Sequence, residues 1–220
     1  MVKIQERDLP LRCVLRMQKK SQEADKYIAD CLPVWEKAVA DGKLLSGTVF
    51  TLEDQIFVYY ECTVPFCIEE YLPKIGEYVY LWPGQAKPRP YIPMVKLYQS
   101  IPMEEVRDWK RKKPVTPYLR VSRMDIDKLQ SYIFYHYQLQ EEEPGHNGRY
   151  LGIWDSEDWC VLYNEENSER PIDTDYQGKL STHDCPISQW HEYMTPHFIF
   201  WPDGEKYHDA DILLHVQAYV

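Results

Sequence analysis

The stretch Arg12-Cys-Val-Leu-Arg-Met-Gln18 has the apolar character of a short β-strand, and Tyr118-Leu-Arg-Val-Ser-Arg-Met124 echoes it in the second half of the chain. Two further echoes follow in the same order, namely Trp82-Pro83 with Trp201-Pro202 and Lys96-Leu-Tyr-Gln99 with Leu214-His-Val-Gln217. An ordered internal repeat predicts that one structural unit occurs twice.

Each opening strand is followed by the same expected series of elements. In the first half the hydrophobic pattern predicts a helix over 21–41, two strands about a turn within 46–61, a helix over 65–79 and a strand over 93–98. The second half predicts a helix from Asp125, strands over 150–154 and 159–163, a helix over 187–195 and a strand over 211–219. The order β-α-β-β-α-β is that of the ferredoxin-like split unit.

Two such units predict an α+β protein in which tandem ferredoxin-like repeats pack sheet to sheet as a pseudo-twofold α/β barrel, because each sheet has an apolar face to cover. We expect an N-terminal repeat over 1–103, a charged linker over 104–117 and a C-terminal repeat over 118–220. Internal duplication supplies two sheets within one chain, so a monomeric pseudo-dimer and a homodimer are both open.

The composition of the chain limits the classes of partner and cofactor that it is expected to bind. The 220 residues carry a formal net charge of −10, and the basic cluster Trp109-Lys-Arg-Lys-Lys-Pro114 reads as a solvated linker, so no nucleic-acid partner is expected. No apolar run is long enough for a membrane span, and the charged N-terminus favours a cytoplasmic protein. The six cysteines form no C-x-x-C pair and the histidines show no zinc spacing, so we expect neither a metal nor another cofactor.

The octapeptide Ser131-Tyr-Ile-Phe-Tyr-His-Tyr-Gln138 is the strongest candidate for a ligand site. It holds four aromatic rings and one histidine, and Tyr132 and His136 lie one helical turn apart on the same face. A shift of 105 residues aligns this pair with Tyr27 and Cys31 in the first half. The pair reads either as the floor of a small-molecule site or as helix packing with a buried histidine.

At these residues the chain resembles the L-rhamnose mutarotases, small ferredoxin-like proteins that interconvert sugar anomers. The first half matches their helix frame in Tyr27-Ile-Ala-Asp-Cys31-Leu-Pro-Val-Trp35-Glu36, with cysteine in place of the family's histidine. The second half matches the Tyr132–His136 pair, and Gln189-Trp-His-Glu-Tyr-Met-Thr195 matches the second helix, with His191 replacing a tryptophan.

The resemblance implies that His136 is the catalytic proton donor and that four residues bind a monosaccharide: Tyr132, Tyr150, Trp190 and His191. Tyr150 best represents a family tyrosine, but a one-residue slip would turn its side chain to the other face of the sheet. A histidine titrates near neutrality whereas a cysteine does not, so the second half is expected to hold the active site and the first half to be degenerate.

Two alternatives to a cofactor-free monosaccharide mutarotase stay open. One is a non-catalytic barrel that binds a sugar or another small molecule. The other is a cofactor-free oxygenase or lyase, since this fold carries many chemistries. Whether the chain is an enzyme is therefore not decided by its sequence.

Overall fold

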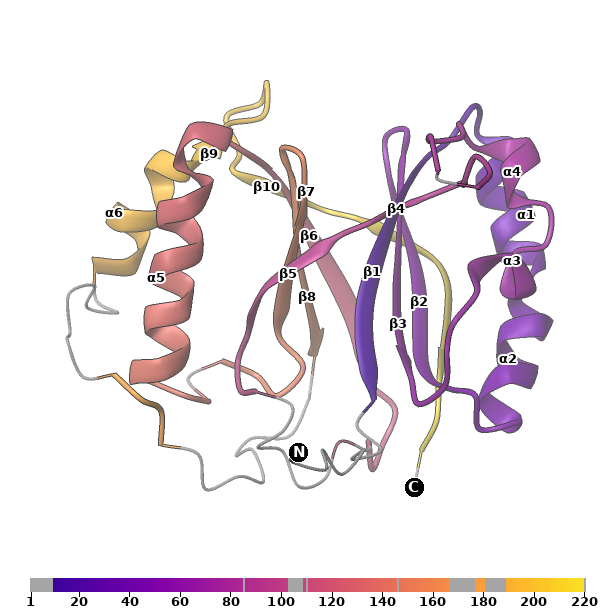
Figure 1. The fold of residues 1–220 in the computed structure, drawn as a ribbon, viewed down its shortest axis with the longest axis horizontal. Coiled ribbons are helices and arrows are strands. Elements are labelled where there is room, and N and C mark those ends of the chain that lie inside the picture. The colour runs from indigo at the N-terminus through magenta and orange to yellow at the C-terminus, as the bar shows by residue number, and fades with distance from the viewer. Residues whose placement is uncertain are drawn as a thin grey trace.

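The structure is a computed structural model of the 220-residue chain. It describes residues 10–84, 86–102, 109, 111–145, 147–166, 177–180 and 189–219. Two antiparallel sheets face each other in the middle of the molecule, and helices cover the outer face of each (Figure 1). The expected α+β class is therefore confirmed.

The first sheet has the strand order β11-β2-β3-β1-β4, formed by Asp211–Gln217, Leu44–Leu52, Gln55–Cys62, Leu11–Gln18 and Ile92–Pro93. Its outer face carries four helices: α1 (Glu23–Asp30), α2 (Leu32–Ala40), α3 (Ile68–Tyr71) and α4 (Ile75–Tyr78). The single helix expected over 21–41 is two helices because Pro33, in the first turn of α2, has no N–H to continue the ladder. Pro73 likewise separates α3 from α4.

The second sheet has the strand order β10-β6-β8-β7-β5, with β9 also pairing with β6. These strands are Tyr207–Asp209, Thr116–Met124, Trp159–Glu166, Gly152–Ser156, Val95–Gln99 and, for β9, Phe198–Ile199. Helices α5 (Leu129–Glu142) and α6 (Trp190–Met194) cover its outer face, with short 3₁₀ turns at Ile126–Lys128 and Thr195–His197.

The closing strand of each half lies in the sheet of the other half. Strand β5 pairs with β7, and β11 pairs with β2. Each exchanged strand satisfies backbone groups at a sheet edge that would otherwise be open. The division at 1–103, 104–117 and 118–220, and a duplicated ferredoxin-like unit as its origin, stay predictions.

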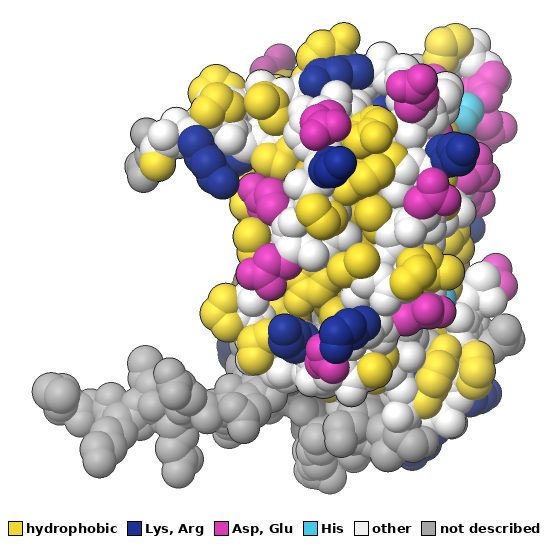
Figure 2. Space-filling view, turned by 90° about the vertical axis from the view of Figure 1, so that its right-hand side faces the viewer, with side chains coloured by type: hydrophobic (Ala, Val, Ile, Leu, Met, Phe, Trp, Pro, Cys, Tyr) yellow, Lys and Arg dark blue, Asp and Glu magenta, His cyan; other side chains and the backbone are white. Residues whose placement is uncertain are grey.

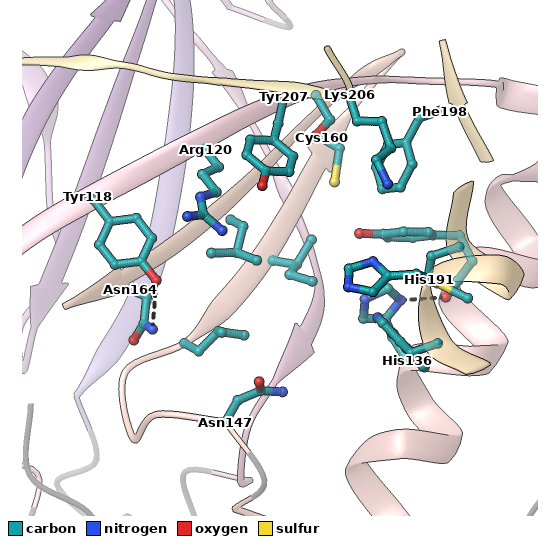
Figure 3. A pocket seen from close by; sticks show the side chains of 17 residues that line it. Tyr118, Arg120, His136, Asn147, Cys160, Asn164, His191, Phe198, Lys206 and Tyr207 are labelled. Atoms are coloured by element: carbon teal, nitrogen blue, oxygen red, sulfur yellow. Dashed lines mark hydrogen bonds between the residues drawn. The ribbon is translucent and has the colours of Figure 1, made fainter. Parts of the chain in front are cut away.

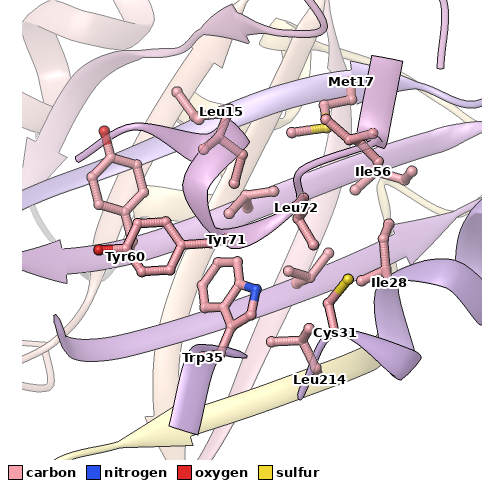
Figure 4. Packing of buried hydrophobic residues seen from close by; sticks show 14 of the residues in the cluster. Leu15, Met17, Ile28, Cys31, Trp35, Ile56, Tyr60, Tyr71, Leu72 and Leu214 are labelled. Carbon is pink, nitrogen blue, oxygen red and sulfur yellow. The ribbon is translucent and has the colours of Figure 1, made fainter. Parts of the chain in front are cut away.

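Three apolar clusters fill the layers. The first lies between the first sheet and α1–α4 and includes Ile28, Cys31 and Trp35 (Figure 4). The second lies between the two sheets, and the third between the second sheet and α5–α6. The outer face of the first-half helices is mixed, with hydrophobic side chains set among acidic and basic ones (Figure 2).

A buried ionic cluster joins the two sheets. Arg111 donates hydrogen bonds to the carboxylates of Glu61 and Glu165, at 2.9 Å from its Nη2 to Glu61 Oε1 and 3.1 Å from its Nε to Glu165 Oε2. Burial raises the pKa of Glu61, but the Arg111 and Arg12 cations outweigh it and hold that pKa below its ordinary value. The interpretation of residues 109–114 as a solvated linker is therefore wrong for Arg111, which is only 4% exposed.

No helix in the described part of the chain is both long and apolar enough to cross a membrane.

Candidate functional site

A pocket of about 450 Å³ lies between the second sheet and the helices α5 and α6 (Figure 3). Its floor is apolar and comes from the strands, through Leu151, Ile153, Cys160 and Leu162. A cavity of this size is typical of small-molecule sites.

Strand alternation explains which residues face the pocket. On β6, Leu119 and Val121 point into the core between the sheets, so Tyr118, Arg120 and Ser122 point to the opposite face and line the pocket. On β8 the same alternation sends Cys160, Leu162 and Asn164 into the pocket and Val161 and Tyr163 into the core.

His136 enters the pocket wall from α5 and is 5% exposed. Its Nδ1 lies 2.8 Å from the backbone carbonyl oxygen of Tyr132. Because a carbonyl only accepts, Nδ1 carries the proton and Nε2 is the acceptor of the neutral ring.

Burial lowers the pKa of His136 to about 4, and the hydrogen bond to the Tyr132 carbonyl opposes that shift only in part. His197 lowers the pKa further. The imidazole is therefore neutral at pH 7, where it can accept a hydrogen bond at Nε2 but holds no extra proton to give.

Aromatic rings hold this imidazole in place. The ring centroid of His136 lies 4.1 Å from that of Tyr132, 4.9 Å from Trp190 and 5.4 Å from Tyr98, the last two in edge contacts. Burial raises the pKa of Tyr132 well above its ordinary value, and the Cys160 side chain on the pocket floor raises it further. These ring contacts restrict how the His136 imidazole can turn.

The structure brings four of the five sequence-predicted site residues to this pocket, namely Tyr132, His136, Trp190 and His191. Tyr150 lies outside it. The Tyr150 hydroxyl donates to the backbone carbonyl of Trp109 at 3.1 Å, within the core between the sheets. Its chain neighbour Leu151 lines the pocket instead, so the side chains of adjacent residues point to opposite sides of the sheet.

Sequence reasoning missed the polar end of the pocket, which is formed by Tyr118, Arg120, Asn164 and Tyr207, and it also missed Lys206. In Figure 3 Arg120, Tyr118 and Tyr207 lie on one side of the pocket, and Lys206 and His191 on the other. Alternation of polar side chains along residues 118–122 is a signal that could have located this end.

The corresponding helices of the first half are packed against their sheet. Cys31 and Trp35 belong to the apolar cluster there, as Figure 4 shows. The Tyr27 ring stacks on Tyr78 at 4.4 Å, and its hydroxyl accepts a hydrogen bond of 2.8 Å from the Lys74 N–H. The side chains aligned with Tyr132 and His136 therefore serve packing in the first half.

The described residues hold no group of three or more His, Cys, Asp or Glu side chains placed to share a metal ion.

The structure is that of an α+β protein with two facing antiparallel sheets and a pocket beneath the helices of the second sheet. No family model matches the sequence, and no curated protein matches it. A "putative monooxygenase" from Fusobacterium nucleatum subsp. nucleatum is similar in structure at 11% identity and a TM-score of 0.47, covering 95% of this chain and 94% of that chain. A "putative monooxygenase" from Lactobacillus acidophilus is similar at 6% identity and a TM-score of 0.46, covering 95% and 96%. An "anthrone oxidase-like protein" is similar at 11% identity and a TM-score of 0.40, covering 96% and 94%.

These structures carry oxygenase and oxidase names, so the assignment to the L-rhamnose mutarotases was wrong, and so was the isomerase function that it implied. The motifs behind it are short aromatic patterns on helices, which many proteins use to pack a helix on a sheet. A histidine that is neutral at pH 7 also fits poorly with proton donation to a sugar ring.

Proposed function

We propose that this chain, built from two ferredoxin-like units, binds a small hydroxylated aromatic molecule in the pocket of its second half and acts on it as a cofactor-free oxygenase. The observation that carries the proposal is the neutral imidazole of His136, held with Nε2 as an acceptor in an aromatic and apolar pocket.

The lining of the pocket suits a ligand that is aromatic and carries a hydroxyl group. Aliphatic side chains on the floor and the rings of Trp190 and Phe198 suit a flat, apolar ligand. A ligand hydroxyl can donate to His136 Nε2 because burial keeps that ring unprotonated at pH 7.

The reaction needs the ligand to become electron-rich. Lys206 is the cation at the α6 side, where its Nζ lies 3.3 Å from Thr195 Oγ1, directly after α6. An ammonium in an apolar pocket stabilises a phenolate more strongly than it would in water. The ligand hydroxyl passes its proton to His136 Nε2 as O₂ takes electrons from the ring, and the Lys206 ammonium stabilises the negative charge that builds on that oxygen.

The overall reaction balances without a reductant. A phenol with hydrogen on its para carbon takes up one O₂ and gives the para-quinone and water. The two hydrogens of the water come from the hydroxyl and the ring carbon, and one oxygen atom stays on the product.

The test combines calorimetric ligand binding with an oxygen electrode, using a panel of 1-naphthols with hydrogen on the carbon para to the hydroxyl. We expect the wild type to bind members of the panel and to consume one O₂ per quinone formed. His136→Asn and Lys206→Met should each slow oxygen uptake by about tenfold or more. Lys128→Met is the matched control, since Lys128 lies outside the pocket and pairs with Asp125.

Two outcomes would contradict the proposal in different ways. Binding without oxygen consumption, for every member of the panel, would identify a non-catalytic binding barrel. Failure of the whole panel to bind would remove the pocket as a site for hydroxylated aromatics.

A further inference from the structure

We infer that the ligand of this pocket carries a carboxylate, and that Arg120 is the residue that selects it. This inference rests on the proposed function, because it takes the hydroxyl of the same ligand to lie at the His136 side. The substrate class is then a hydroxylated aromatic acid.

The charge of the pocket differs from that of the chain. Acidic residues outnumber basic ones by 35 to 25 in the sequence. Among the described residues that line the pocket, however, Arg120 and Lys206 are the charged ones, and there is no Asp or Glu. An acidic protein with a cationic pocket favours an anionic ligand inside it.

Two aromatic rings hold the Arg120 guanidinium. Its central carbon lies 4.7 Å from the ring centroid of Tyr207 and 5.4 Å from that of Tyr118. Both distances are within the range of cation–π contacts, which orient the guanidinium and leave its N–H groups free for another acceptor.

The Arg120 guanidinium makes a long ion pair with Asp209 and no hydrogen bond from its Nε within the described structure. That Nε atom is buried. The Asp209 carboxylate oxygen Oδ1 lies 3.4 Å from Nε in an ion pair whose side chains are 41% exposed for Arg120 and 67% exposed for Asp209. On the same strand, Arg123 donates from Nε to Asp158 at 2.9 Å. Arg120 therefore has a long, solvent-exposed ion pair where Arg123 has a hydrogen-bonded one.

A hydroxyl donor lies beside this guanidinium. Asn164 Nδ2 donates to the Tyr118 hydroxyl oxygen at 3.1 Å, so the Tyr118 O–H proton can point elsewhere. A carboxylate at this end of the pocket could accept from the planar fork of Arg120 and from that hydroxyl together. The fork matches two carboxylate oxygens better than it matches a single neutral carbonyl.

Acidic side chains lie near Arg120 in a neighbouring depression of the surface. A shallow depression shares Tyr118, Arg120 and Asn164 with the pocket and is also lined by Glu165, Glu166 and Asp209. Glu165 is bound by Arg111, whereas Asp209 Oδ1 lies 3.4 Å from Arg120 Nε, so Asp209 can compete with a ligand for Arg120. Removing the Asp209 charge should therefore strengthen the binding of an anionic ligand.

The probes are a hydroxynaphthoic acid with its two substituents on opposite rings and the matching hydroxynaphthamide, compared by calorimetry at pH 7. We expect wild type to bind the acid about tenfold more tightly than the amide, as for one added charge-assisted contact. Arg120→Gln should abolish that preference by weakening the binding of the acid more than that of the amide, while Arg120→Lys should restore part of the preference. Asp209→Asn should increase acid affinity, and Arg123→Gln should change neither ligand.

The outcomes separate the two proposals. Equal binding of acid and amide by the wild type, or a preference that survives in Arg120→Gln, overturns the role of Arg120 and leaves the hydroxyl pocket standing. Amide binding by Arg120→Gln also shows that this variant is folded. Failure of both probes to bind the wild type overturns the carboxylate site together with the proposed function.

Discussion

Replacing His136 with asparagine tests whether the imidazole in the pocket is neutral. Burial lowers its pKa from 6.5 to about 4, a difference of about 2.5 units. The unfolded chain takes up a proton at this residue below pH 6.5, and the folded chain does not until about pH 4. The wild type therefore loses stability as the pH falls through this window, by about 3 kcal/mol at 1.36 kcal/mol per unit.

The assay is urea unfolding of the wild type and His136→Asn at several pH values between 7 and 4. Asparagine cannot titrate, and its amide can still donate to the Tyr132 carbonyl that now accepts from Nδ1. The stability of the wild type relative to the variant should fall by about 3 kcal/mol from pH 7 to pH 4. A constant difference over that range, or an imidazole pKa near 6.5 by NMR, would refute the neutral histidine.

Three further predictions concern stability. Burial, reinforced by Asp158, raises the pKa of Asp155 from 3.8 to about 7, so the wild type loses stability as the pH rises through this window. The free energy of unfolding of Asp155→Asn relative to the wild type, measured with urea, should increase by up to about 4 kcal/mol from pH 4 to pH 8. A constant difference over this range would contradict the prediction. Arg111→Met should cost about 3–5 kcal/mol by denaturant unfolding, because it removes the cation that the buried carboxylates of Glu61 and Glu165 share. A loss below about 1 kcal/mol would mean that the cluster is dispensable. Gly47→Ala should cost about 1–3 kcal/mol in the same assay, because its Cβ would lie 2.5 Å from a Trp35 ring carbon, and wild-type stability would show that the indole moves freely aside.

The local pattern of the sequence predicted which residues lie on the same face of a single helix. The four-residue spacing of Tyr132 and His136 predicted that they share a helix face, and both side chains line the pocket from α5. The pattern did not predict where the helices are interrupted. The helices expected over 21–41 and 65–79 are each divided into two near a proline.

Contacts between residues that are far apart in the sequence could not be predicted from local patterns. The basic run at 109–114 has the composition of a solvated linker, yet Arg111 is buried between two sheets. Its carboxylate partners lie 50 and 54 residues away in sequence, and no local pattern connects them. The exchange of β5 and β11 between the sheets likewise depends on which edges meet after the halves have folded.

The sequence by itself determined the α+β class, the alternation of its strands and the placing of Tyr132 and His136 on one helix face, because these depend on local periodicity. Only the tertiary structure decided that His136 is neutral, that Tyr150 faces the inter-sheet core and that Arg120 lines the pocket with no hydrogen bond from its Nε. Those properties depend on desolvation and on groups brought together from distant parts of the chain, and both arise when the sheets and helices pack.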